Sequence, residues 1–432
     1  MLATVIICAV TVILMIVCIL FFPKLKLGKV SLSTYWLVTV LGAVVLLVSG
    51  QANVVEVGKA LVADTAVNPI KILILFLSMT LLSVFLDELG FFRFLACAAL
   101  KHAQGGQKRL FLILYLTVSI LTVFTSNDVI ILSFTPFICY FAKNARIDPT
   151  PYLAAEFIAA NTWSMALIIG NPTNIYLATA YGIDFLSYLK VSLVPTLFAG
   201  LTAFLALWLL YRKKLSAPIE HAPEEVVLQD KFLLWVGIIH LGVCTLMLAI
   251  GSYIGIEMWL VSLSAVVSLF LITLLSSAVR KKKPKELWRC IKRAPYALIP
   301  FVLSMFVMIV VLSEKGATEA IWRFLDGEFL ILKYGAASFL TANIINNIPM
   351  SVLFSSVLGN VQTGALGAVF ATIIGSNIGA FLTPIGALAG IMWGNILSEH
   401  GLKFGYLDFL KMGVIVAVPT LLAALGGLAL MI

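Results

Sequence analysis

The stretch Thr125-Ser126-Asn127-Asp128 places four polar residues between two apolar runs. The upstream run, 110–124, and the downstream run, 129–142, are each shorter than the roughly 20 apolar residues that a spanning helix needs. Together they predict a re-entrant helical hairpin, over 109–143, whose polar tip lies inside the membrane. Irregular backbone is tolerated at that depth only where protein or a wet cavity surrounds it.

The composition is that of an all-α polytopic membrane protein. The 432 residues are 62% hydrophobic and 11% charged, with a mean hydropathy of +1.09. The apolar runs are continuous rather than alternating, which excludes a membrane β-barrel. The net charge of +9 comes from basic residues in short loops, so we predict a lipid bilayer and no nucleic acid as partner. The six cysteines show no CxxC or histidine pairing, which predicts neither a metal site nor a cofactor.

The chain repeats one series of segments. Asp184-Phe185-Leu186 and Val194-Pro195-Thr196 recur, at the same offset, as Asp408-Phe409-Leu410 and Val418-Pro419-Thr420. The predicted first repeat, 1–215, holds three spans, the hairpin 109–143, a broken helix 152–181 and a span 190–211. After a cytoplasmic connector, 216–231, the second repeat covers 232–432 with a hairpin 334–358, a broken helix 365–397 and a last span 409–432. We expect about 10 transmembrane segments, two re-entrant hairpins and two broken helices.

Basic residues predict the orientation in the plasma (bacterial inner) membrane. With the N-terminus outside, all but six of the 29 Lys and Arg residues fall on the cytoplasmic side. Each repeat has an odd number of crossings, so the second is inverted and the C-terminus also lies outside. The first hairpin then enters from the cytoplasm and the second from outside, and their tips meet near the midplane.

Paired broken segments in two inverted repeats indicate a transporter binding site. Helix N-termini at the breaks suit an anion, whereas unwound carbonyls and Asn or Ser side chains suit a cation or a polar neutral solute. The predicted substrate- and ion-binding residues are Ser126, Asn127, Asp128, Gly170, Asn171, Thr173, Asn174, Asn346, Asn347, Ser376, Asn377, Thr383 and Gly386. The alternative is that they only cap buried helix ends.

Asp128 and Glu156 are the candidates for coupling. The second tip carries Asn347 where the first has Asp128, so one carboxylate lies between two similar polar clusters. A carboxylate in the membrane is costly and marks function by default, so we hypothesise that Asp128 carries a coupling proton or ligates a coupling cation such as sodium. Alternatively, Asp128 caps the helix that starts at Val129. Glu156 is either a second relay or a solvated residue at the cytoplasmic edge.

As a set, these motifs resemble the ion transporter superfamily, which includes arsenite exporters, sodium/proton antiporters and dicarboxylate carriers. The resemblance covers essentially the whole chain and implies an elevator-like motion and a homodimer. In the dicarboxylate branch both tips carry Ser-Asn-Thr, where Ser and Asn help to bind sodium while Asn and Thr hold the substrate carboxylates. Here Asp128 and Ile348 replace the two threonines. The acidic tip and Leu382-Thr383-Pro384-Ile385-Gly386 are more similar to the arsenite-exporter branch.

The leading prediction is a secondary active transporter of a small inorganic oxyanion or oxyacid, foremost arsenite/antimonite efflux coupled to the proton motive force. The runner-up is a sodium- or proton-coupled di- or tricarboxylate carrier, or a cation/proton antiporter. The sequence lacks HExxH and GxSxG, which argues against an enzyme. It also lacks a phosphate-binding loop, so an ATPase would have to be a separate subunit.

Overall fold

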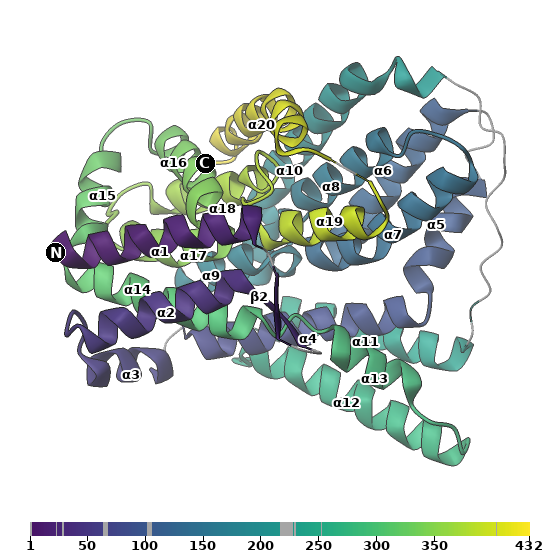
Figure 1. Cartoon of the computed structure of the whole chain (residues 1–432), viewed down its shortest axis with the longest axis horizontal. Helices are drawn as coiled ribbons and strands as arrows, with labels where there is room; N and C mark the ends of the chain where they lie inside the picture. Colours follow the sequence, from purple (N-terminus) through teal and green to yellow (C-terminus); the bar gives the residue numbers. More distant parts are fainter. Residues whose placement is uncertain are drawn as a thin grey trace.

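A computed structural model describes residues 2–22, 24–27, 30–63, 68–101, 106–216, 228, 230–251, 253–402 and 404–432, mostly as helices (Figure 1). The predicted connector 216–231 therefore lies largely outside the described residues. In the first half the helices are α1 (Leu2–Phe21), α2 (Thr34–Val48), α3 (Val54–Val62), α4 (Pro69–Glu88), α5 (Phe91–Lys101), α6 (Gln107–Phe124), α7 (Asn127–Asn144), α8 (Thr150–Trp163), α9 (Pro172–Ala180) and α10 (Phe185–Tyr211). Two 3-10 turns, η1 (Ile168–Gly170) and η2 (Lys214–Ser216), complete this half.

Within the described residues, the second half also has ten helices, and they follow the same order. Its helices are α11 (Lys231–Gly251), α12 (Met258–Val279), α13 (Lys285–Arg293), α14 (Leu298–Glu314), α15 (Ala317–Leu325), α16 (Leu330–Ile345), α17 (Asn347–Leu358), α18 (Ala365–Gly379), α19 (Leu388–Glu399) and α20 (Tyr406–Ala429). The sequence did not predict α3, α13 or the antiparallel pair of short strands β1 (Lys24–Leu27) and β2 (Val30–Ser33).

Eight helical segments of the described chain are long and apolar enough to cross a membrane. This confirms the prediction of an all-α polytopic membrane protein, apart from the small β1–β2 pair. One of the eight is α6, whose 18 residues include the polar positions 107–109 that the sequence prediction left out of the apolar run. Length alone therefore does not establish a re-entrant hairpin, and its insertion from one side stays a prediction.

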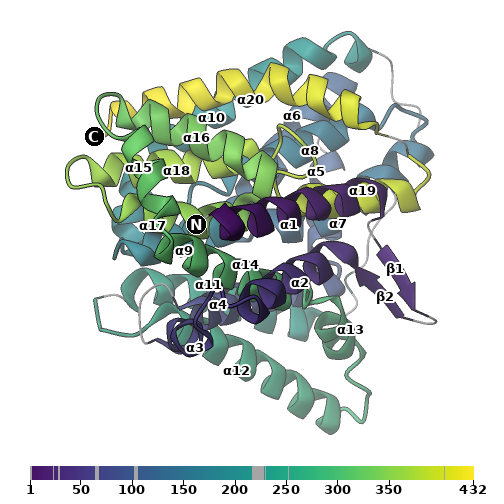
Figure 2. The same ribbon diagram turned by 60° about the vertical axis from the view of Figure 1, so that its left-hand side comes forward.

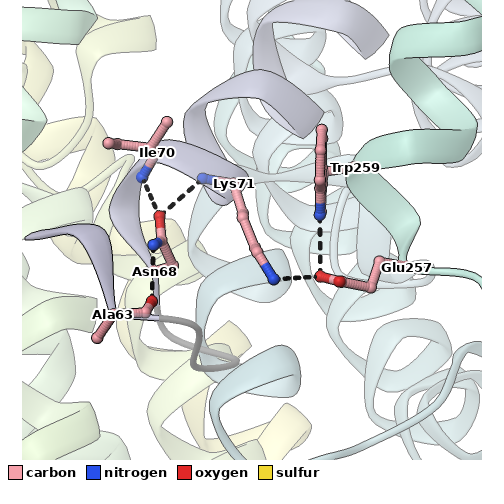
Figure 3. Close-up of polar contacts among 6 residues, drawn as sticks. All are labelled: Ala63, Asn68, Ile70, Lys71, Glu257 and Trp259. Carbon is pink, nitrogen blue, oxygen red and sulfur yellow. Dashed lines mark hydrogen bonds and ion pairs between the residues drawn. The ribbon is translucent and has the colours of Figure 1, made fainter.

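Side-chain caps fix where the spans begin. Asn68 accepts hydrogen bonds from the backbone N–H groups of Ile70 and Lys71, and Pro69 occupies the first turn of α4, where no N–H is needed. Figure 3 shows Lys71 reaching Glu257, at the start of α12, over 2.6 Å, while the Trp259 indole donates to the same carboxylate. At the other end of α4, Arg293 of α13 pairs with Asp87 and Glu88 at 2.7 Å each. Both ends of α4 are thus tied to the second half.

Corresponding helices make corresponding contacts in the two halves. α2 packs on α14 as α12 packs on α4, and α7 packs on α19 as α17 packs on α9. α6 packs on α8 as α16 packs on α18, while α10 and α20 pack on each other and run side by side in Figures 1 and 2. The halves therefore interlock through exchanged partners. Their inverted orientation in a membrane and the boundaries at 215 and 232 stay predictions.

Two apolar cores support the broken helices. The larger core takes side chains from every helix from α4 to α20. The smaller core gathers side chains of α1, α2, α4 and α14 around Phe301, and reaches Ile348 beside the second tip and Leu388 at the start of α19. The helix ends that carry the polar motifs therefore lie between these two apolar cores.

Candidate functional site

The first tip is a two-residue link, Thr125 and Ser126, between α6 and α7. Asn127, the first residue of α7, donates from Nδ2 to Asn161 Oδ1 of α8 at 3.0 Å, and Asn161 Nδ2 donates to the Phe157 carbonyl at 2.8 Å. The buried Ser126 hydroxyl has no hydrogen-bond partner within the described chain. A buried polar group without a partner costs about 1–3 kcal/mol, so Ser126 is a position where a ligand would gain affinity.

The second tip is strained and tied to the break in the second half. Asn346 adopts φ 75° and ψ 155°, a backbone conformation that almost only glycine takes and that often marks functional sites. Asn346 Nδ2 donates to the Ile385 carbonyl at 3.0 Å, and the Asn347 N–H donates to the Gly386 carbonyl at 3.0 Å. Among the described residues, nothing donates to the buried Asn347 Oδ1. This tip therefore also presents an unused polar atom.

Asn377, in the last turns of α18, joins the two broken helices. Its Oδ1 accepts from Ser164 Oγ at 3.0 Å and Asn171 Nδ2 at 2.9 Å, and its Nδ2 donates to Asn174 Oδ1 at 2.7 Å. Asn171 also caps α9 by accepting from the Thr173 N–H, and Asn174 donates to the Ser164 carbonyl. These three amides, all fully buried, bond to one another and to the backbone. We call them the asparagine clamp, and their geometry favours a structural role.

Other predicted site residues also stabilise the polypeptide around the two helix breaks. Ser376 Oγ donates to Thr173 Oγ1 at 3.1 Å, and Thr383 Oγ1 donates to Asn343 Oδ1 at 2.6 Å. A Cβ atom on Gly170 would overlap the backbone of Ser164, so this glycine permits close packing of the break. Gly386 is equally confined by Gly379 and Asn343. The ligand-binding prediction for these residues stays untested.

Asp128 faces a different space from the asparagine clamp. It lines a cavity of about 80 Å³ together with Tyr35 of α2, Thr80 of α4 and Asn395 of α19. The backbone N–H of Asp128 donates to Asn127 Oδ1, whereas its carboxylate has no hydrogen bond or ion pair within the described chain. The buried Thr80 hydroxyl has no partner there either. α7 begins at Asn127 with Ser126 as its cap, so the alternative that Asp128 caps a helix at Val129 is wrong.

Glu156 is buried in the middle of α8. Its exposed fraction is 0%, so the alternative of a solvated residue at the membrane edge is wrong. Thr135 of α7 and Trp393 of α19 both contact its carboxyl group. No group of three or more His, Cys, Asp or Glu residues that could hold a metal occurs in the part of the chain that the structure describes.

Sequence reasoning missed several polar residues that complete this arrangement. Asn161 and Ser164 of the first broken helix, Asn343 beside the second tip and Thr80 in the Asp128 cavity were not predicted. Asn161 could have been predicted from the repeat, because it lies just before the first break as Asn377 lies just before the second. Thr80 carried none, because it lies within an ordinary apolar span.

Residues 30–371 match the family described as CitMHS, citrate transporter. The chain belongs to the citrate transporter family. It is similar to the arsenical pump membrane protein of Escherichia coli, with 27% identity over 441 residues and 97% of each chain covered. The protein of that name from Yersinia enterocolitica is 26% identical over 374 residues, covering 82% of this chain and 85% of that one.

A solved structure shares the fold. That of Neisseria gonorrhoeae MtrF, described with a class of antimetabolite efflux pumps, has a TM-score of 0.54 at 12% identity and covers 99% of this chain and 94% of that chain. Together with the family match, this confirms the resemblance to the ion transporter superfamily and the membrane-transporter fold. The chain is an integral membrane secondary transporter of the citrate transporter family.

Proposed function

We propose that this transporter exports arsenite and antimonite, driven by the proton motive force, with both termini outside the inner membrane. The observation that carries the proposal is the unpaired Asp128 carboxylate in a small cavity beside the unpaired Thr80 hydroxyl. An ionised carboxylate buried without a cation costs several kcal/mol, so a proton, a cation or a hydroxyl-bearing substrate must compensate for it. The arsenical pump names of the relatives support the same substrate.

Arsenous acid suits this cavity in charge and size. It is uncharged near neutral pH and carries three hydroxyl groups, which donate to a carboxylate and exchange hydrogen bonds with Thr80 and Asn395. A cavity of about 80 Å³ accommodates a few water molecules or one solute of similar size. Substrate and proton would compete for Asp128, so protonation of Asp128 from outside would release the substrate there.

The second candidate is a di- or tricarboxylate carrier coupled to sodium or protons, which the family description favours. Asp128 argues against it. A substrate carboxylate about 4 Å from an ionised Asp128 would be repelled by about 4 kcal/mol at an effective dielectric constant near 20. A homodimer and a separate ATPase subunit remain predictions from the resemblance.

The test is arsenite accumulation in energised everted membrane vesicles. We expect Asp128→Asn to lower proton-driven accumulation about tenfold or more, because an amide binds no proton. Asp148→Asn is the matched control, since Asp148 is an exposed loop residue that pairs with Lys214. Accumulation by Asp128→Asn with unchanged pH dependence would refute the coupling role. Citrate uptake in sodium- or proton-loaded vesicles, without arsenite movement, would instead establish the carboxylate carrier.

A further inference from the structure

Glu156 is a buried acid whose carboxyl group has two hydrogen-bond partners and no cation beside it within the described chain. Thr135 Oγ1 of α7 lies 3.1 Å from Glu156 Oε1, and Trp393 Nε1 of α19 donates to Oε2 at 3.3 Å. Within the described residues no Lys, Arg or His forms an ion pair with it. Carboxylates in such surroundings are rare because an uncompensated buried charge is costly.

The carboxyl group lies where three elements of the site meet. α7 leads away from Asp128, α8 leads to the first break, and α19 leads away from the second break. α7 packs on both α8 and α19. Trp393 is itself held by the rings of Phe157, Phe404 and Phe409, so its indole N–H is fixed in place. Any change at Glu156 therefore acts on the contact between the two halves.

Both protonation states of Glu156 keep their hydrogen bonds here. When the carboxyl group is ionised, Thr135 and Trp393 both donate to it. When Oε1 carries a proton, it donates to Thr135 Oγ1, and we expect the Thr135 hydroxyl to rotate toward a backbone carbonyl of the preceding turn of α7, as helical threonines commonly do. Trp393 keeps its bond, because an indole N–H only donates. Proton uptake thus reverses one hydrogen bond without leaving a polar group unsatisfied.

The neighbouring ionisable groups leave Glu156 as an isolated acid. The Cys139 thiol, one turn after Thr135 in α7, interacts electrostatically with Glu156. The other ionisable groups on these three helices are Asp128, Tyr140, Lys143, Tyr152, Glu399 and His400, and no hydrogen bond joins any of them to Glu156. Tyr152 bonds instead to Gln107, and His400 to the Ile396 carbonyl.

We propose that Glu156 is a second proton-carrying residue of the transport cycle, and that Thr135 and Trp393 are the positioning residues that hold it in both states. The proposal rests on the proposed proton-driven transport. One proton binds at Oε1 and leaves by the same atom, so no further reactant is needed. The Thr135 bond that reverses joins α7 to α8, and the same carboxyl group is bonded to Trp393 of α19, so proton uptake takes place where the two halves touch.

The experiment is infrared difference spectroscopy of the full chain in lipid nanodiscs, between alkaline and acidic pH. We expect a carbonyl band of a neutral buried acid that Glu156→Gln removes and that Trp393→Phe shifts, since the band loses one donor. Glutamine keeps both contacts, because its carbonyl accepts from Trp393 and its NH₂ donates to Thr135. Glu156→Gln therefore preserves a purely structural role and abolishes a proton-carrying one.

Arsenite accumulation in energised vesicles supplies the second readout. We expect Glu156→Gln to lower it about tenfold, with Asp148→Asn at the wild-type level. A wild-type infrared spectrum, or wild-type accumulation with an unchanged pH profile, in Glu156→Gln would overturn the proposal. If the chain moves no arsenite but the Glu156 band titrates, the proton site stands and only the proposed substrate fails.

Discussion

Replacing Asn377 with alanine tests whether the asparagine clamp is structural. The substitution removes the bonds to Asn171 Nδ2 at 2.9 Å and to Asn174 Oδ1 at 2.7 Å, so these two buried polar atoms lose their side-chain partner, while Asn171 Oδ1 and Asn174 Nδ2 keep theirs. Ser164 loses less, because its hydroxyl also contacts the Asn161 carbonyl at 2.9 Å. Each unsatisfied buried group costs about 1–3 kcal/mol, so Asn377→Ala is expected to lower the free energy of unfolding by about 2–6 kcal/mol.

The assay is equilibrium unfolding by sodium dodecyl sulfate in mixed micelles, with wild type and variants in the same detergent. Asn360→Ala is the matched control, because Asn360 is partly exposed and makes only long bonds of 3.3 and 3.4 Å to nearby carbonyls. We expect that control to change the unfolding free energy by about 0.5 kcal/mol or less. An Asn377→Ala variant within about 1 kcal/mol of this control would refute the clamp, and would return Asn377 to the predicted ligand-binding residues.

Two further predictions use the same unfolding assay. Gly375→Ala should lower the free energy of unfolding by about 2 kcal/mol or more, because a Cβ would overlap Ser338 Oγ and the Gly335 carbonyl. The control Gly394→Ala, with open space around it, should be neutral or slightly stabilising. Equal effects of the two substitutions would contradict this packing. Asp184→Ala should cost about 1 kcal/mol at neutral pH through the lost cap of α10. The Ser187 hydroxyl, with the N–H groups of Ser187 and Leu186, holds the pKa of Asp184 below its usual value. The cap's contribution is therefore present above about pH 4 and lost as the pH falls through the lowered pKa, and a pH-independent loss in Asp184→Ala would show that the charge is irrelevant.

The sequence by itself determined the helical segments and where they break. The last span, predicted over 409–432, became α20 (Tyr406–Ala429), and the hairpin predicted over 334–358 became α16 (Leu330–Ile345) and α17 (Asn347–Leu358). Gly170 and Pro172 marked the end of the first break, where α9 begins, because these residues act on their own backbone, but α8 already ends at Trp163. Local chemistry is enough for such features. It also identified the two tips, since polar residues between apolar runs are visible without any fold.

Only the tertiary structure decided which polar residues bond to one another and which remain unpaired. Asn377 finds Asn171 and Asn174 more than 200 positions away, so no sequence spacing could show that these amides satisfy one another. The same packing leaves Asp128 beside Thr80 without a partner and brings Trp393 to Glu156. Whether a buried polar atom is satisfied depends on the distance and direction to groups on other helices, and those are set by the packing of the whole chain.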